Sequence, residues 1–189
     1  MNRIIIQNVF FPFFVFSEEL SLLRVYERFQ DLTLILNDIE IEEKTKILVN
    51  RGPGSYSGIR TALSYVLGLE HGKAVSPENI FSFTSFDFVL SEFPVYYASW
   101  PRNEAVSFEE TRGYLQKTPS EQIIYVNGTE AKKLPSVTIV SEKDIISDQI
   151  DYILFEKLVT PEHIQKFLKV TEFSKDRTPL YINPVHITT

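Results

Sequence analysis

The chain has 189 residues, 43% of them hydrophobic and 23% charged, which is the composition of a folded protein of one large or two small domains. Its 25 acidic residues outnumber its 19 basic ones and give a net charge of −6. This balance excludes a broad basic surface that grips a nucleic-acid backbone unaided. The absence of cysteine excludes disulfides, thiolate metal sites and a cysteine nucleophile, so we expect a cytoplasmic protein.

The N-terminal apolar run, residues 4–16, has the length of a signal-peptide core. Gln7, Asn8 and Pro12 interrupt it, and it is shorter than the ~20 apolar residues of a membrane span. We therefore expect core strands and no membrane segment. The β-branched and aromatic runs predict strands over Arg3–Val9 and Phe11–Phe16.

A third apolar run covers residues 20–27, and apolar residues at 29, 32, 35 and 36 predict a short amphipathic helix. A strand is predicted at Lys46–Asn50, followed by a glycine-rich turn and a helix that begins after Ser55 and ends at Gly68 or Gly72. The turn at 73–79 is the predicted boundary between two lobes, residues 1–78 and 79–189. Alternating strands and helices in both halves predict an α/β fold.

The second half is predicted in less detail. We expect helices at 84–92, 149–158 and 161–168, the last capped by Thr160. Strands are expected at 80–83, 94–99, 104–108, 123–126, 137–140 and 179–182.

The segment Arg51-Gly52-Pro53-Gly54-Ser55-Tyr56-Ser57-Gly58-Ile59-Arg60 is the most informative part of the sequence. A glycine turn between a strand and a helix is able to bind phosphate through free N–H groups. However, only three residues separate Gly54 from Gly58, and Ile59 and Arg60 follow, so the P-loop spacing is absent. The dinucleotide fingerprint also fails, because its third glycine comes one residue late.

The helix after Ser55 has one bulky face and one face of small residues. Gly54, Gly58 and Ala62 share a stripe, with Ser57, Thr61, Ser64 and Gly68 beside it. Such a face allows another helix to approach closely. That helix belongs either to the same chain or to a partner, and the pattern alone does not decide between them.

The segment from Arg51 to Arg60 closely resembles the R-G-P-G-S-F-T-G-L/V-R motif of the TsaB family, also called YeaZ. Ile80-Phe81-Ser82-Phe83-Thr84-Ser85 and Pro179-Leu180-Tyr181-Ile182 are similar to two further family segments. The resemblance implies two RNase H-like lobes of the actin-like ATPase architecture, here reduced in size.

The resemblance also implies a function. Members of this family are non-catalytic scaffold partners of the transferase TsaD in forming threonylcarbamoyladenosine in tRNA, with the ATPase TsaE joining the complex. We expect a TsaD-like and a TsaE-like partner, only indirect contact with tRNA, and a homodimer when the chain is alone. An arginine at position 58 is expected to block partner binding in a chain that still folds. The expected interface residues are Arg51, Gly54, Ser55, Tyr56, Ser57, Gly58, Arg60, Thr61, Ala62, Phe29 and Leu32.

The sequence departs from the family where catalysis would be placed. Gln7 and Asn8 stand where relatives have an Asp at the end of the first strand, and Tyr97-Ala98-Ser99-Trp100-Pro101-Arg102 replaces an Asp-Ala-Arg turn. His71, His163 and His186 do not form a metal-binding pair. We therefore expect no catalytic residue, cofactor or metal.

Two alternatives remain open. One is a small actin-like nucleotide-binding phosphotransferase that uses the Gly52–Gly58 loop for phosphate. The other is a general α/β interaction module in which the glycine motif serves internal packing alone.

Overall fold

The computed structural model describes residues 2–90, 96–99, 112–116, 124–133, 138–141 and 152–181. The chain divides into two compact units. The first unit is Met1–Ser85 with Glu172–Tyr181, and the second is Phe86–Thr171 with Ile182–Thr189. The division falls after residue 85 instead of residue 78, and a C-terminal segment returns to the first unit.

A five-stranded mixed sheet forms the centre of the first unit, in the order β3-β2-β1-β4-β5. The strand β1 runs antiparallel to β2, and β2 antiparallel to β3, whereas β1, β4 and β5 are parallel. Side chains of β1, β2 and β4 are almost completely buried, which explains their aromatic and β-branched runs. The strands are β1 (Arg3–Gln7), β2 (Phe13–Ser17), β3 (Leu22–Tyr26), β4 (Lys46–Asn50) and β5 (Ile80–Phe83).

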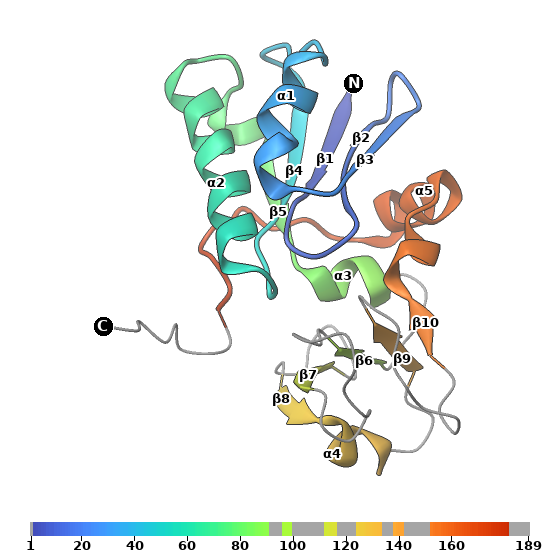
Figure 1. Ribbon diagram of the computed structural model, residues 1–189. Helices are drawn as coiled ribbons and strands as arrows, with labels where there is room; N and C mark the ends of the chain where they lie inside the picture. The colour runs from blue at the N-terminus through green and yellow to red at the C-terminus, as the bar shows by residue number, and fades with distance from the viewer. Residues whose placement is uncertain are drawn as a thin grey trace. The chain divides into compact units, whose positions relative to one another are not determined.

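The helices α1 (Leu32–Asn37) and α2 (Tyr56–His71) lie side by side against this sheet (Figure 1). Short 3-10 helices cover Phe29–Asp31, just before α1, and Pro77–Asn79. The helix α2 begins after Ser55, whose Oγ accepts a hydrogen bond from the N–H of Gly58 at 3.2 Å. Both helices bury an apolar stripe, made up of Leu32 and Leu36 on α1 and Ile59, Ala62, Leu63 and Val66 on α2.

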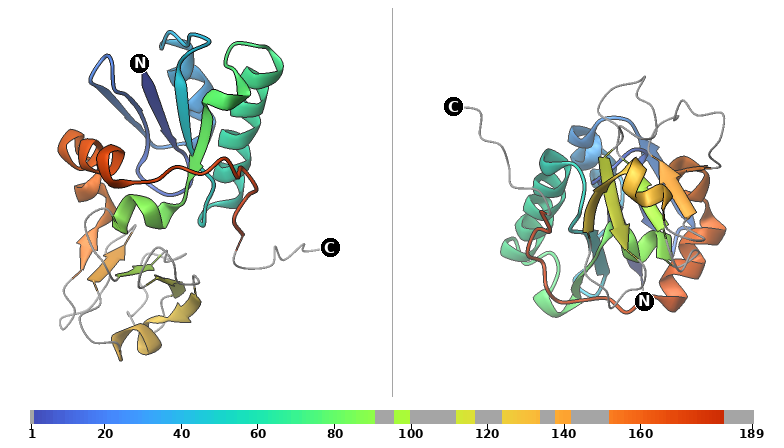
Figure 2. Two further views of the ribbon diagram at one scale, coloured as in Figure 1. Left: turned by 180° about the vertical axis from the view of Figure 1, so that it is seen from behind. Right: turned by 90° about the horizontal axis from the view of Figure 1, so that it is seen from below.

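The second unit contains a sheet in the order β10-β9-β6-β7-β8. Strand β6 runs antiparallel to β7, and β7 runs antiparallel to β8, whereas β6, β9 and β10 are parallel. Both sheets therefore have the same strand topology. Figure 2 shows both sheets from two further sides. The elements are α3 (Ser85–Leu90), which starts at the last residue of the first unit, then β6 (Tyr96–Ser99), β7 (Arg112–Gln116), β8 (Ile124–Asn127), α4 (Gly128–Lys132), β9 (Thr138–Ser141), β10 (Ile153–Leu154), a 3-10 helix (Phe155–Leu158) and α5 (Pro161–Val170).

The α/β class predicted from the sequence is confirmed, and strands β4 and β5 have the predicted bounds. Two predictions are wrong. Within the predicted helix 149–158, the described residues form β10 and a 3-10 helix, and residues 179–181 form no strand. The strand predicted at 104–108 lies outside the described residues, and β7 and α4 were not predicted. No helix among the described residues is long and apolar enough to cross a membrane.

Candidate functional site

In the glycine turn before α2, backbone N–H groups donate hydrogen bonds to other groups of the same chain. The N–H of Gly52 donates to Oδ1 of Asn50 at 2.9 Å, and the N–H of Ser55 donates to the carbonyl of Val9 at 2.7 Å. Gly52 has a φ of +114°, and a β-carbon there would lie 2.6 Å from the carbonyl oxygen of Leu180. The N–H groups of Gly52, Ser55 and Gly58 are thus already used within the first unit, which leaves less of the turn to bind a phosphate.

Buried amide side chains occupy the carboxyl ends of β1 and β4, where α/β sheets commonly bind ligands. Gln7 Oε1 accepts from the N–H of Val9 at 2.9 Å and from Asn50 Nδ2 at 3.2 Å. Ser85 Oγ donates to the carbonyl of Pro53 at 2.7 Å. These amides and the hydroxyl therefore tie the turn to the sheet by neutral hydrogen bonds.

Asn8 forms a second part of this buried group. Its Nδ2 donates to the carbonyls of Phe29 at 3.3 Å and Gly58 at 3.2 Å, and its Oδ1 accepts from the hydroxyl of Tyr26 at 2.9 Å. Asn8 therefore links β1, the segment before α1 and the first turn of α2. Burial also raises the pKa of the Tyr26 hydroxyl, so it stays protonated and able to donate this bond.

The prediction that the stripe Gly54, Gly58 and Ala62 is open to a second helix is wrong. A β-carbon at Gly54 would overlap Val9, and one at Gly58 would overlap the carbonyl oxygen of Asn8. Gly58 and Ala62 are buried within the chain, as is Leu32 of α1. The loop after β1 covers Gly54 and Gly58, so these two positions are not open to a partner.

The neighbouring stripe of short side chains is open instead. A shallow, open groove of about 540 Å³ lies between α1 and α2. The groove is lined by Thr33 of α1 and by Ser57, Arg60, Thr61, Ser64 and Tyr65 of α2. A β-carbon added at Gly68, further along the same stripe, would meet no atom within 4 Å. Ser57, Thr61, Ser64 and Gly68 follow the i, i+4, i+7, i+11 spacing of one helix face.

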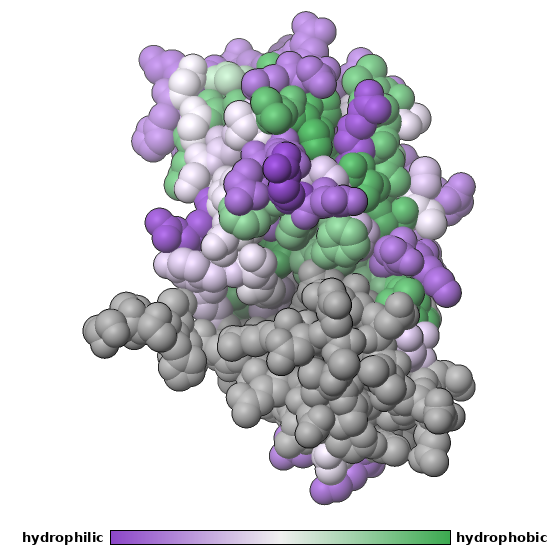
Figure 3. Space-filling model, viewed as in Figure 1, coloured by the Kyte–Doolittle hydropathy of each residue, from purple (hydrophilic) through white to green (hydrophobic). Residues whose placement is uncertain are grey.

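Exposed apolar side chains accompany the groove on both helices. Leu34 of α1 is 67% exposed and Leu67 of α2 is 45% exposed. Figure 3 shows apolar and polar residues next to one another on this face of the first unit.

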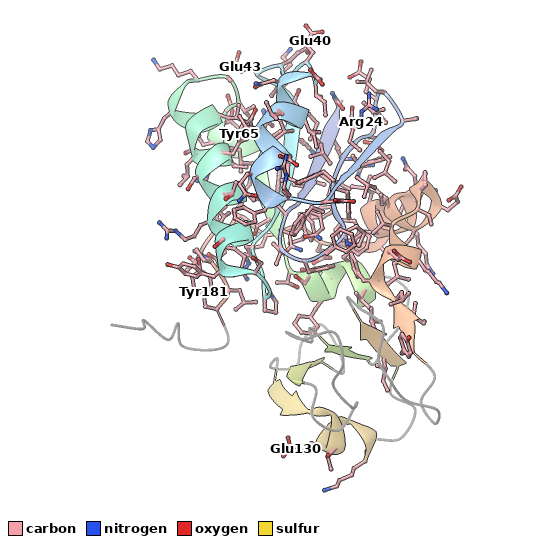
Figure 4. The ribbon with its side chains drawn as sticks, viewed as in Figure 1. Arg24, Glu40, Glu43, Tyr65, Glu130 and Tyr181 are labelled. Atoms are coloured by element: carbon pink, nitrogen blue, oxygen red, sulfur yellow. The ribbon has the colours of Figure 1, made fainter. Side chains whose placement is uncertain are left out.

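Two tyrosines meet at the N-terminal end of α2. The rings of Tyr56 and Tyr181 are 5.1 Å apart, and the guanidinium of Arg60 lies 5.3 Å from the Tyr56 ring. Figure 4 shows Tyr181 beside this end of α2 and Tyr65 further along the same helix. Burial, together with Tyr56, raises the pKa of the Tyr181 hydroxyl, while Arg60 acts in the opposite direction.

The remaining predicted interface residues differ in their exposure. Ser55, Tyr56, Ser57 and Arg60 are exposed, and Thr61 and Phe29 are half-exposed. Arg51 is held inside the first unit, because its Nη1 lies 3.1 Å from Asp176 Oδ2 and donates to the carbonyl of Thr178 at 3.0 Å. Sequence reasoning missed Thr33, Leu34, Tyr65 and Tyr181 as members of this surface.

Among the described residues, no three His, Cys, Asp or Glu side chains gather as a metal site would require. His163 is buried in the second unit, with Nε2 2.9 Å from the carbonyl oxygen of Phe88. His71 is exposed in the last turn of α2.

No family model matches the sequence, and no curated protein matches it either. Two solved structures from Pseudomonas aeruginosa share its fold. An uncharacterized protein with similarity to peptidase YeaZ has a TM-score of 0.57, and YeaZ itself has a TM-score of 0.56. Each is 12% identical, over 96% of this chain and 99% of the other. The chain therefore has a YeaZ-like fold.

Proposed function

We propose that this chain is a non-catalytic scaffold that binds a TsaD-like transferase in the formation of threonylcarbamoyladenosine in tRNA. Two independent observations support the proposal. The segment from Arg51 to Arg60 resembles the TsaB motif, and the fold is similar to YeaZ over nearly the whole length of both chains. A TsaE-like ATPase would join the assembly, in the cytoplasm.

The observation that carries the binding role is the open groove between α1 and α2. Its hydroxyl-bearing side chains at Ser57, Thr61 and Ser64 are short, so the backbone of a partner helix is able to come close. Leu34 and Leu67 add apolar surface that a partner would bury. Without the transferase, a second copy of the chain would use the same surface and form a homodimer.

We further propose that the two units are the two lobes of an actin-like architecture of reduced size. The support is that both sheets have the same order and the same pattern of parallel and antiparallel neighbours. In this interpretation the second lobe is a diverged copy of the first.

A scaffold role, and not phosphoryl transfer, fits the chemistry at the ends of β1 and β4. Gln7, Asn8 and Asn50 supply neutral amides where a metal-bound phosphate would need carboxylates. Their polar atoms bond to the turn that the phosphotransferase alternative requires to be free. Any contact with tRNA is then made through the transferase.

Two arginine variants test the proposed surface. Ser64 is exposed in the groove, and Ser21 is exposed in the turn between β2 and β3. Ser64→Arg adds bulk and charge where a partner helix would lie, whereas Ser21→Arg makes the same change outside the groove. Binding to the transferase from the same organism is measured by calorimetry, and unfolding of each variant is measured alongside.

We expect Ser64→Arg to weaken binding by more than about tenfold and to fold normally, since its side chain has room in solvent. Ser21→Arg should bind as the unchanged chain does. In a cell depleted of its TsaB protein, Ser21→Arg should restore the modified nucleoside and Ser64→Arg should not. Equal binding by both variants would show that the groove is not the binding surface.

A further inference from the structure

Arg60 differs from most arginines in the described part of the chain. Arg3, Arg28, Arg51 and Arg177 each pair with a carboxylate of the same unit. Within the described ranges Arg60 has no such partner, and neither has Arg24 on β3. Of the two, Arg60 lines the groove between α1 and α2.

The guanidinium of Arg60 contacts Tyr56. It lies over the Tyr56 ring at 5.3 Å, and its Nη1 is 3.5 Å from the Tyr56 hydroxyl. The hydrogen bond to Tyr56 uses Nη1, and the contact with the ring uses no N–H group, which leaves the donors at Nε and Nη2 to bind another group. Those donors match the two oxygens of a carboxylate.

The other groove-lining residues are uncharged. They are Thr33, Ser57, Thr61, Ser64 and Tyr65. Arg60 is therefore the charged residue among those that line the groove, and its charge is positive although the whole chain has a net charge of −6. A partner segment that fits this groove is expected to bring a negative charge to the position of Arg60.

From this arrangement we infer that Arg60 binds a carboxylate on a partner helix in the groove, and that Tyr56 and Tyr181 position its guanidinium. The inference rests on the proposed function and specifies the partner's chemistry: a helix with an Asp or Glu one to two turns from its closest contact with Ser64. Arg60 and Ser64 are themselves one turn apart on α2.

Tyr181 belongs to the C-terminal segment, which is anchored on the first unit at several points. Ser174 and Ser82 exchange backbone hydrogen bonds of 3.0 and 2.8 Å, and Arg177 pairs with Glu70. The N–H of Leu180 donates to the carbonyl of Arg51 at 2.8 Å. This anchoring places the Tyr181 ring against Tyr56, so the segment takes part in the binding surface.

The test compares charge reversal inside and outside the groove. Arg60→Glu and Arg24→Glu change the net charge equally, and Figure 4 shows Arg24 on β3. Binding to the transferase is measured by calorimetry at low and at high salt. We expect Arg60→Glu to weaken binding about tenfold or more at low salt and Arg24→Glu to leave it unchanged. The affinity of the unchanged chain should fall with added salt more steeply than that of Arg60→Glu.

Tyr181 is tested by a pair of variants that separate ring contact from folding. Tyr181→Phe keeps the ring against Tyr56 and should retain binding, whereas Tyr181→Ala should weaken binding several-fold with an unchanged unfolding midpoint. Equal binding by these two variants would overturn the role of Tyr181.

The outcomes also separate this inference from the proposed function. If Ser64→Arg weakens binding and Arg60→Glu binds as Arg24→Glu does, the groove is the interface and the carboxylate site is wrong. If neither Ser64→Arg nor Arg60→Glu weakens binding, both proposals fail. A partner variant with one acidic helix residue changed to Arg that restores binding to Arg60→Glu would identify the carboxylate directly.

Discussion

The backbone carbonyl of Asn8 lies against the α-carbon of Gly58, with no space between them for a β-carbon. The same Asn8 donates through its side chain to the carbonyl of Gly58 at 3.2 Å. These contacts fix the loop after β1 against the first turn of α2. They also place the stripe of glycines inside the first unit and leave the stripe of hydroxyl residues outside it.

Two glycines of the same helix should therefore respond oppositely to alanine. Gly58→Ala should lower the free energy of unfolding by at least about 2 kcal/mol, because the new methyl group overlaps a backbone oxygen. Gly68→Ala should raise it by about 0.5–1 kcal/mol, because the position is open and alanine favours helix. Urea unfolding measures both, and similar effects at the two positions would contradict the packing described.

This prediction replaces the expectation that an arginine at position 58 blocks a partner in a folded chain. A larger side chain at Gly58 would displace the loop after β1, so lost binding would report damage to the fold. Ser64 is the suitable position for such a variant, because it is exposed.

A second prediction concerns Asn8→Asp, which places a carboxylate in the buried position next to the end of the first strand. The Asn8 Nδ2 faces two carbonyl oxygens, and a carboxylate there would be repelled by both. Burial and this repulsion would raise the pKa of the new carboxyl above its unfolded value of about 3.9. The variant should therefore be less stable by several kcal/mol at pH 7, with the loss diminishing as the pH falls toward 4.

The control for this variant is Asn37→Asp, at the exposed last residue of α1, which should cost no more than about 1 kcal/mol. Thermal unfolding between pH 4 and pH 7 measures both proteins. A loss at Asn8 that does not change with pH would show that the introduced carboxylate remains hydrated.

A third prediction concerns the ion pair of Glu70 with Arg177, which anchors the C-terminal segment. The hydrogen bond from Arg177 lowers the pKa of the Glu70 carboxyl. A lowered carboxyl pKa stabilises the fold above the unfolded pKa, and this stabilisation is lost as the pH falls through the folded pKa. Glu70→Gln should therefore weaken the anchoring at pH 7, and the difference from the unchanged chain should shrink as the pH falls below about 4.3 and vanish below the folded pKa of Glu70.

Amide hydrogen exchange measures the anchoring of the C-terminal segment at individual residues. The N–H groups of Leu180 and Ser82 bond across the anchored segment, so they should exchange faster in Glu70→Gln at pH 7. Protection equal to that of the unchanged chain would mean that the ion pair does not hold the segment.

A fourth prediction separates the scaffold from the phosphotransferase alternative. With the N–H groups of Gly52 and Ser55 already bonded inside the unit, calorimetry with ATP and Mg²⁺ should detect no binding by the purified chain. Tight binding with turnover would overturn the scaffold proposal.

The sequence predicted those parts of the fold that depend on local residue pattern. The strands Lys46–Asn50 and Ile80–Phe83 are short runs rich in β-branched and aromatic residues and were predicted with the observed bounds. The helix predicted to begin after Ser55 does so, and the Ser55 side chain accepts a hydrogen bond from the N–H of Gly58. Residues 153–154 were wrongly predicted as helix, because their pairing with β9 is a non-local contact that periodicity does not reveal.

The candidate site was predicted in part for the same reason. Helical spacing shows which residues of α2 share a face, but it does not show which neighbouring segment covers that face. Asn8 and Val9 cover Gly54 and Gly58, so the open surface is shifted to Ser57, Thr61 and Ser64. Tyr181 meets Tyr56 across more than a hundred residues of sequence, a contact that no local pattern predicts.

The central claim, that the surface of α1 and α2 binds a TsaD-like transferase, is tested most directly by hydrogen exchange of the chain with and without that transferase. The claim predicts added protection in residues 29–37 and 56–71, together with slower exchange at Tyr181. Protection confined to the second unit, or no change when the two proteins are mixed at high concentration, would contradict it.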